Sequence, residues 1–171
     1  MNRIFTIGHS NHSWSDFVST LLRNHITMVI DVRRFPGSRR YPHFKKANMI
    51  KLLAHENIHY VHVEKLGGRR HKADLADNSN SYWKNRSFQA YANYMKTRSF
   101  KEGIDEILSV SKHNTIVIVC AEALPWRCHR RFISDYLTML GLEVHDIFNI
   151  RELNLHELTS FAQIIDGEIR Y

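Results

Sequence analysis

Short segments rich in apolar and β-branched residues recur along the chain and predict buried β-strands. They cover residues 3–7, 27–32, 58–63, 115–120 and 144–150. The segment at 115–120 is the clearest, because it is apolar or β-branched throughout. A continuous run of this kind is typical of a strand covered on both faces, as in a parallel sheet.

Segments with apolar residues at helical spacing lie between these strands. A first helix is predicted to begin after Ser13, with Ser13 and Asp16 forming a short-acid version of the capping box. Four more are predicted over residues 47–55, 88–95, 100–111 and 128–140. Gly141 is a stop signal for the fourth of these. A last helix, capped by Asn154 and Glu157, is predicted to carry Leu155, Leu158, Phe161 and Ile165.

Strands that alternate with helices imply a mainly parallel sheet between helical layers. We therefore expect an α/β fold: a three-layer sandwich with a sheet of about five strands, in one domain that spans residues 1–171. The length of 171 residues fits one domain of ordinary size. Residues 64–86 lack periodicity and are long for a structureless connection, which favours a functional or mobile loop.

No apolar run approaches the roughly 20 residues that a membrane span needs. The N-terminal segment is too short and too strand-like for a signal peptide. Two cysteines, Cys120 and Cys128, do not make a disulfide framework. We therefore expect a cytoplasmic protein that does not contact a membrane.

The charge of the chain is unevenly distributed. There are 24 Lys and Arg residues against 17 Asp and Glu residues, which gives a net charge of +7. Residues 33–101 hold 16 of the basic residues and only 4 of the acidic ones. A segregated cationic stretch favours a polyanionic partner, nucleic acid first. The alternative is a solvated basic surface without a partner.

Polar clusters follow four of the predicted strands, at residues 8–12, 31–40, 66–70 and 120–130. Ligands of such sheets bind outside the carboxyl ends of the strands, so we expect these clusters to form one site. The candidate residues for binding an anionic ligand are Arg33, Ser38, Arg39, Gly67, Gly68, Arg69, Glu122, Trp126, Arg127 and Arg130.

The fourth cluster carries the most chemistry. Cys120 ends a strand, and a short loop then leads to Arg127 and the start of a helix. Such a loop can cradle an oxyanion and lower the pKa of a thiol. Cys120 is therefore the candidate nucleophile, with His9 or His129 as the acid or base. Three alternatives stay open: Cys120 is a buried core residue, Cys128 is the reactive thiolate, or the two cysteines form a redox pair.

This loop, taken with residues 29–33, resembles the layout of the rhodanese and Cys-phosphatase group. In that group a cysteine follows the central strand and an arginine closes its loop. Two features depart from the pattern. Six residues separate Cys120 from Arg127, one more than in the phosphatase loop. The loop has no glycine, and Pro125 lacks an N–H donor.

Four ordered motifs resemble the family described as domain of unknown function DUF488. They are Thr6-Ile7-Gly8-His9-Ser10-Asn11, the stretch from Asp31-Val32-Arg33 to Ser38-Arg39, Leu66-Gly67-Gly68-Arg69, and Cys120-Ala121-Glu122 through His129-Arg130. These motifs spread over nearly the whole chain. The resemblance implies that their residues form a shared polar site, and it names no reaction.

Other site types find little support in the sequence. Cys128 and His129 are adjacent rather than spaced as zinc ligands, so we expect no metal. Ser10 lacks the glycine-flanked elbow of a serine nucleophile. No Gly-x-Gly-x-x-Gly run follows a strand, and no cofactor is expected.

Two hypotheses of function remain. In the first, the protein is an enzyme, a transferase or hydrolase that acts on a phosphate- or sulfur-containing substrate. In the second, it is a non-catalytic nucleic-acid-binding module that uses residues 33–101. The candidate aromatic residues for stacking on bases are Tyr41, Tyr82, Trp83 and Trp126. The oligomeric state does not follow from the sequence.

Overall fold

A six-stranded sheet forms the middle layer of the protein. The computed structural model describes residues 3–70 and 78–171. The strands are β1 (Ile4–Gly8), β2 (Met28–Asp31), β3 (His59–His62), β4 (Ile116–Cys120), β5 (Val144–Asn149) and β6 (Glu152–Leu155). Their order in the sheet is β3-β2-β4-β1-β5-β6, and all neighbours are parallel except the antiparallel pair β5 and β6.

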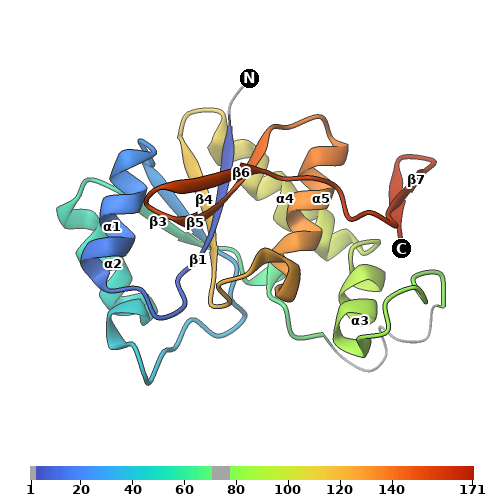
Figure 1. Ribbon diagram of the computed structural model, residues 1–171, viewed down its shortest axis with the longest axis horizontal. Helices are drawn as coiled ribbons and strands as arrows, with labels where there is room; N and C mark the ends of the chain where they lie inside the picture. Colours follow the sequence, from blue (N-terminus) through green and yellow to red (C-terminus); the bar gives the residue numbers. More distant parts are fainter. Residues whose placement is uncertain (1–2, 71–77) are drawn as a thin grey trace.

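Helices cover both faces of this sheet (Figure 1). They are α1 (Trp14–Arg23), α2 (Lys46–His55), α3 (Arg86–Tyr94), α4 (Arg98–Ser111) and α5 (Arg130–Met139). The first two helices lie on one face and the other three on the opposite face. The predicted three-layer α/β sandwich with a mainly parallel sheet is therefore confirmed.

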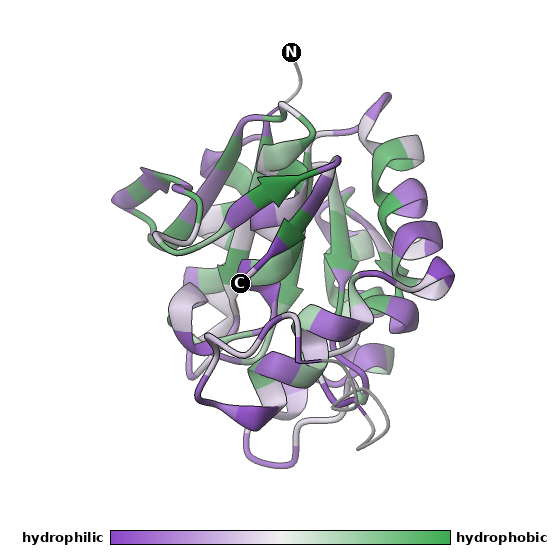
Figure 2. Cartoon of the chain, turned by 90° about the vertical axis from the view of Figure 1, so that its right-hand side faces the viewer, coloured by the Kyte–Doolittle hydropathy of each residue, from purple (hydrophilic) through white to green (hydrophobic). Residues whose placement is uncertain are grey.

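The central strand β4 shows why its sequence is continuously apolar. Ile116, Ile118 and Cys120 pack into the core beneath α3, α4 and α5. Val117 and Val119 pack into a second core beneath α1 and α2. Figure 2 shows these hydrophobic strands enclosed by helices of mixed character. Because side chains alternate along a strand, Cys120 is directed towards the α5 side of the sheet.

Local sequence signals account for several element boundaries. The Ser13 hydroxyl accepts a hydrogen bond from the Asp16 amide at 3.0 Å, which caps α1 as predicted. α2, α3 and α4 begin one or two residues before the predicted positions and end within one residue of them. Between β4 and α5, a short 3-10 turn, η4 (Pro125–Arg127), follows the loop.

The predicted helix at residues 154–165 is wrong. The chain there forms β6, which pairs with β5, and then a hairpin of β7 (Gln163–Ile165) and β8 (Glu168–Arg170). Asp166 and Gly167 have φ of 52° and 76° and form the turn, as expected of an Asp-Gly hairpin. Tertiary pairing with the edge of the sheet therefore outweighs a weak helical pattern.

The topology brings four loops to one edge of the sheet. β1 and β4 are neighbours, yet the chain leaves β1 for α1 on one face and β4 for α5 on the other. Connections that diverge in this way leave a crevice outside the carboxyl ends of the strands. The loops after β2 and β3 border the same edge.

Part of the long irregular stretch at 64–86 falls within the structure. It begins with a 3-10 turn, η2 (Glu64–Leu66), whereas residues 71–77 lie outside the described residues. In the two described ranges, no helix is long and apolar enough to cross a membrane.

Candidate functional site

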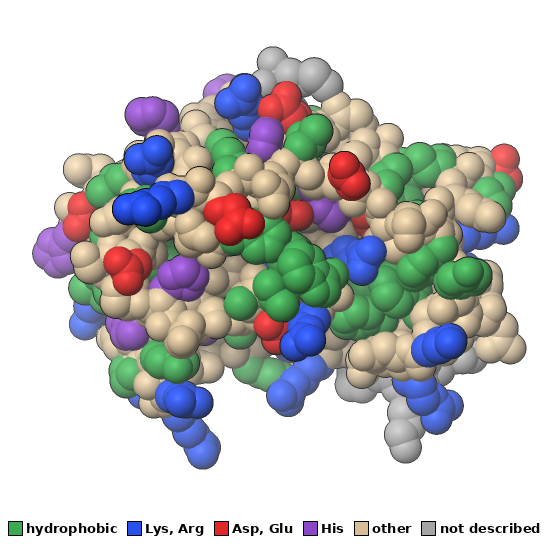
Figure 3. All heavy atoms as spheres, in the orientation of Figure 1, with side chains coloured by type: hydrophobic (Ala, Val, Ile, Leu, Met, Phe, Trp, Pro, Cys, Tyr) green, Lys and Arg blue, Asp and Glu red, His purple; other side chains and the backbone are tan. Residues whose placement is uncertain are grey.

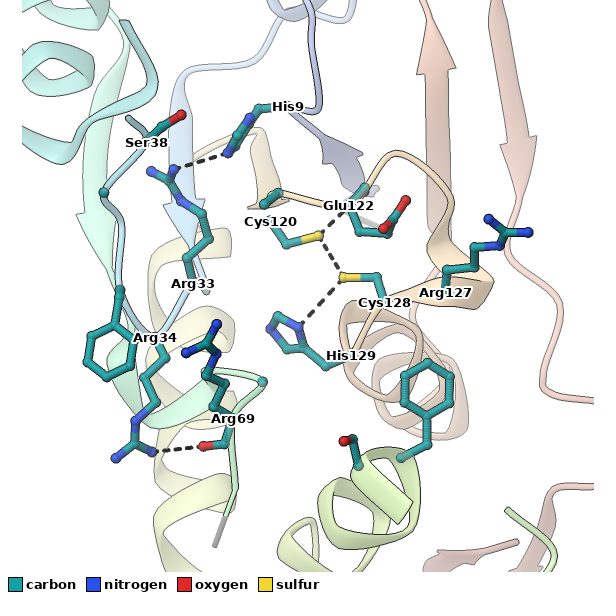
Figure 4. A pocket seen from close by; sticks show the side chains of 16 residues that line it. His9, Arg33, Arg34, Ser38, Arg69, Cys120, Glu122, Arg127, Cys128 and His129 are labelled. Carbon is teal, nitrogen blue, oxygen red and sulfur yellow. Dashed lines mark hydrogen bonds between the residues drawn. The ribbon is translucent and has the colours of Figure 1, made fainter. Parts of the chain in front are cut away.

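A pocket of about 550 Å³ occupies the carboxyl edge of the sheet (Figure 4). The loops after β1, β2, β3 and β4 and the start of α3 contribute to its wall. The predicted site residues that line it are His9, Arg33, Ser38, Gly68, Arg69, Cys120, Glu122, Arg127, Cys128 and His129. Its volume is within the range of small-molecule sites, roughly 300–1,000 Å³.

Four other candidates do not line this pocket. Arg39 is exposed outside it, and Gly67 and Arg130 lie behind its wall. Trp126 is 50% exposed and lines a separate hollow with Phe148. Direct contact with a ligand in the pocket is thus not expected of these four.

Arg33 is held by internal partners rather than left available to a ligand. Its guanidinium donates to both carboxylate oxygens of the buried Asp31, with the shortest contact at 2.6 Å. It also donates to the Phe44 carbonyl at 2.8 Å and to His9 Nε2 at 3.1 Å. The Tyr60 hydroxyl donates to the same Asp31 carboxylate. These hydrogen bonds therefore hold Arg33 in the pocket wall.

His9 is similarly occupied. Its Nδ1–H donates to the Ser10 carbonyl, and its Nε2 accepts from Arg33. Burial, followed by the Arg33 charge, lowers the pKa of His9 to about 4. The ring also stacks on Phe44 with centroids 4.3 Å apart. A neutral imidazole with both nitrogens in use is a structural element, so the predicted acid–base role finds no geometric support.

Arg130 is the most deeply enclosed of these arginines, with no exposed surface. It donates to the Cys120 thiol at 2.7 Å, to the carbonyls of Glu122 and Ala123, and to the Thr6 hydroxyl. It therefore fixes the loop after β4 and places a positive charge beside the sulfur atoms. The sequence pattern had predicted Arg127 as the arginine that closes this loop, and the structure has Arg130 there instead.

Three arginines on the pocket wall are more open to solvent. Arg69 is exposed, and its side chain points towards the centre of the pocket (Figure 4). Arg34 lies near the rim and donates to the Arg69 carbonyl. Arg127 is exposed, but its side chain extends away from the sulfur atoms (Figure 4). The carboxylate of Glu122 also lines the pocket.

The two cysteines meet at the pocket wall. Their Sγ atoms are 2.7 Å apart, and both thiols are free. The Cys128 sulfur also accepts from the Arg130 amide at the start of α5, at 3.5 Å. Cys120 and Cys128 are 1% and 5% exposed, so they reach solvent only through the pocket.

The surroundings separate the acidities of the two thiols. Burial opposes ionisation of Cys128, but the hydrogen bond from Cys120 and the charge of Arg130 outweigh it and lower the pKa of Cys128 to about 7. Burial and the role of donor to Cys128 raise the pKa of Cys120 well above its usual value. The pKa of Cys128 is thus lowered and that of Cys120 is raised, with Cys120 as the hydrogen-bond donor of the pair.

His129 lies beside the Cys128 sulfur. Its Nε2–H donates to the Val32 carbonyl at 3.0 Å, because a carbonyl can only accept. Nδ1 is then the acceptor nitrogen, and it is 3.6 Å from the Cys128 sulfur. Burial lowers the pKa of His129 and keeps the ring neutral. The Cys128 thiol, the His129 ring and the Val32 carbonyl thus lie in one hydrogen-bonded row.

Three glycines permit close approaches in the pocket wall. A Cβ atom on Gly8 would lie 1.8 Å from the Glu122 carbonyl oxygen, and one on Gly67 would lie 2.7 Å from the Arg34 Cβ. A Cβ atom on Gly68 would lie 2.5 Å from His129 Nδ1. These positions explain why the first and third motifs contain glycine.

The sequence analysis missed several residues of the pocket wall. Arg34 and Phe35 lie within the second quoted motif but were not among its candidate residues. Ser87 and Phe88 come from the start of α3, and only the packing of that helix reveals them. Among the described residues, no three His, Cys, Asp or Glu side chains are arranged to hold a metal ion.

The fold and the pocket define an α/β protein with paired thiols, a histidine and arginines at the carboxyl edge of its parallel sheet. A family model, described as domain of unknown function DUF488, matches residues 13–137. The chain belongs to this family, as its motifs predicted. Comparison with curated proteins gave no match, and comparison with solved structures gave none either. The likeness to the rhodanese and Cys-phosphatase layout is not confirmed.

Proposed function

We propose that the pocket binds an anionic, phosphate- or sulfur-containing substrate and that Cys128 is its nucleophile. The Cys128 sulfur attacks an electrophilic atom of the bound substrate, and the thiol proton moves to His129 Nδ1. The bond from that atom to its leaving group breaks, and the leaving group takes the proton from His129. The protein is then a cysteine-dependent transferase or hydrolase. This role passes from Cys120, the candidate of the sequence analysis, to the second thiol.

The observation that carries this proposal is the set of contacts around the Cys128 sulfur. It faces the thiol of Cys120, the amide of Arg130 and the free nitrogen of His129, at 2.7, 3.5 and 3.6 Å. Each contact either stabilises a thiolate or accepts its proton. A buried structural cysteine needs none of them.

The anionic character of the substrate follows from Arg69. Its side chain points into the pocket, whereas the Arg33 charge is paired with Asp31 and the donors of the Arg130 guanidinium are used by protein groups. A guanidinium at this place suits a phosphate, sulfonate or carboxylate. Arg34 and Arg127 add positive charge at the rim, and Ser38 adds a hydroxyl.

The proposal can be tested by comparing a negatively charged alkylating reagent with a neutral one. The rates of Cys128 modification by iodoacetate and by iodoacetamide are measured by peptide mass mapping, on folded protein and on protein in urea. We expect the ratio of the iodoacetate rate to the iodoacetamide rate to be higher in the folded state. A ratio that is the same in both states contradicts an anion-binding pocket.

Two matched variants show where the preference arises. Arg69→Gln is expected to reduce the ratio by about fivefold, the equivalent of ~1 kcal/mol for one charge at close range in water. Arg23→Gln removes an exposed charge at the end of α1, which runs back to the opposite edge of the sheet, and is expected to leave the ratio unchanged. Equal effects of the two variants would point to overall charge instead of the pocket.

A second candidate function, nucleic-acid binding without chemistry, is favoured by the rim of the pocket. Phe35 is 65% exposed there, and the Arg34 guanidinium lies 5.9 Å from its ring centroid. Lys and Arg side chains also project along the lower edge in Figure 3, where Figure 1 places the carboxyl ends of the strands. An exposed aromatic ring among cations can stack on an unpaired base.

Phe35 was not a predicted stacking residue, and two of those that were predicted differ in exposure. Tyr82 is 68% exposed and lies against Phe161, whereas Trp83 is partly buried and packs against the core at Phe132. This second function predicts salt-dependent oligonucleotide binding that persists in Cys128→Ser. Binding of that kind, without any reactivity of Cys128 towards the anionic reagent, would favour it over the enzyme.

A further inference from the structure

We propose that Cys120 and Cys128 are a catalytic thiol–disulfide couple that reduces disulfides of anionic thiols. In this activity Cys128 attacks the substrate, and Cys120 resolves the mixed disulfide that results. The inference rests on the pocket and the nucleophile of the proposed function, and the reaction is thiol–disulfide exchange in place of group transfer or hydrolysis. It adds the class of substrate and a role for the second cysteine.

The position of Cys120 leads to this inference. Its sulfur lies 2.7 Å from that of Cys128, and the residue is 1% exposed at the pocket wall. A phosphoryl or acyl group on Cys128 would be released by attack on phosphorus or carbon, for which a thiol touching the sulfur has no use. A neighbouring thiol is useful when the atom to be attacked is the Cys128 sulfur itself.

The first step forms a mixed disulfide. The Cys128 thiolate attacks one sulfur of the substrate disulfide, so that a new bond to the Cys128 sulfur forms and the substrate S–S bond breaks. The departing thiolate takes the proton that Cys128 gave to His129 Nδ1. One substrate thiol leaves, and the other half stays attached to Cys128.

The second step forms the intrachain disulfide. Cys120 attacks the Cys128 sulfur, and the second substrate thiolate leaves with the Cys120 proton. The Arg130 guanidinium, 2.7 Å from the Cys120 sulfur, stabilises the negative charge that develops there. In total two cysteine thiols are oxidised and one substrate disulfide is reduced to two thiols. An external dithiol restores the reduced protein.

The arginines of the pocket indicate which disulfides react. A disulfide must place a sulfur atom in line with the two cysteine sulfurs, and the rest of the molecule then occupies the pocket next to Arg69. Carboxylates on the substrate would be stabilised there. Glutathione disulfide, which carries a net negative charge, and cystamine, which carries two positive charges, are suitable probes.

The experiment follows the products of reduced protein mixed with each probe. Samples are quenched in acid, and mass spectrometry distinguishes mixed from intrachain disulfide. We expect the natural protein to form the intrachain disulfide with release of two glutathiones, faster than with cystamine. Cys120→Ser is expected to stop at glutathione attached to Cys128, and Cys128→Ser is expected to form no adduct on the remaining Cys120.

Two further measurements keep the test decisive. Cys120→Ala is studied beside Cys120→Ser, and circular dichroism shows that each variant is folded. If one variant fails to fold, the other reports the trapped adduct. If both fail, the natural protein still reports whether a mixed disulfide accumulates or is resolved.

The outcomes separate this inference from the proposed function. A stable mixed disulfide in the natural protein would overturn the resolving role of Cys120 while leaving Cys128 as the nucleophile. No reaction with either disulfide, in a protein whose Cys128 still prefers iodoacetate, would overturn the disulfide substrate alone. Faster reaction with cystamine would overturn the anionic class. Loss of the iodoacetate preference would overturn the proposed function itself.

Discussion

At the scale of single residues, the arginines around the pocket have different roles because their partners differ. Arg33 donates to Asp31 and to the Phe44 carbonyl. Arg130 donates to the loop that follows Cys120. Arg69 has its side chain in the pocket. The Arg33 charge is already neutralised by the buried Asp31 carboxylate and attracts little additional anion, so the number of arginines overstates the capacity of the site to bind anions.

Gly8 gives a residue-scale prediction about the pocket wall. In Gly8→Ala the new methyl group would meet the Glu122 carbonyl at 1.8 Å, and this carbonyl is held by Arg130. Relief requires the loop after β4 to move, so we expect a loss of about 1–3 kcal/mol in the free energy of unfolding. Urea denaturation followed by circular dichroism measures it.

Gly37→Ala is the matched control for this substitution. A Cβ atom there has nothing within 4 Å, and the backbone has no positive φ. The free energy of unfolding should change by no more than about 0.5 kcal/mol. Similar losses at the two positions would show that the close contact at Gly8 does not determine the effect.

At the scale of elements, a buried charged network attaches the C-terminal segment to the sheet. His156 donates from Nδ1 to Asp146 on β5 and from Nε2 to Asp135 on α5, at 2.8 and 2.9 Å. The Tyr171 hydroxyl donates to the same Asp135 carboxylate at 2.8 Å. These contacts join the C-terminal segment to β5 and α5. A helix was predicted for this segment, but the chain after β5 is mostly extended.

This network makes stability depend on pH. Burial opposes the charged form of His156, but hydrogen bonds to Asp135 and Asp146 outweigh it and raise its pKa from 6.5 to about 9. A raised pKa stabilises the folded state fully below pH 6.5, and this contribution disappears as the pH rises through about 9. The shift corresponds to stabilisation on the order of 3 kcal/mol.

The contribution of His156 is measured as a difference between two proteins. Urea unfolding of the natural protein and of His156→Gln at pH 6 and at pH 9.5 gives the free energy that His156 adds at each pH. We expect this difference to be larger at pH 6. A difference that is constant with pH, or larger at pH 9.5, would contradict a charged His156 between the two carboxylates.

At the scale of the whole molecule, the sequence was enough to predict that four loops meet at one edge of the sheet. It was not enough to predict the contacts of the individual side chains there. Alternation of strands and helices was enough to place the loops after β1, β2, β3 and β4 at one edge. The proposed roles of Cys120 and Cys128 depend on the contacts of the two sulfur atoms with each other, with His129 and with Arg130. Those contacts depend on how α5 packs against the loop after β4, which a local sequence pattern does not contain.

The wrong prediction of a helix at residues 154–165 also has a cause outside the local sequence. Leu155, Leu158, Phe161 and Ile165 have spacings compatible with a helix, but Leu155 and Ile165 are exposed in the structure. β6 instead pairs with the edge of the sheet at β5. Pairing with β5, which lies outside the helical pattern, therefore determined the conformation of β6. The turn at Asp166 and Gly167, by contrast, has the local sequence of a hairpin turn.

The central claim, that Cys128 is held as a reactive thiolate at the pocket, is tested most directly by its alkylation as a function of pH. Iodoacetamide is applied in pulses to the folded, reduced protein from pH 5 to pH 10, and peptide mass mapping counts modification of each cysteine. The account predicts that Cys128 reacts before Cys120, with a midpoint at a pKa of about 7. Modification of Cys120 first, or a Cys128 midpoint at the ordinary thiol value of about 8.5, would contradict it.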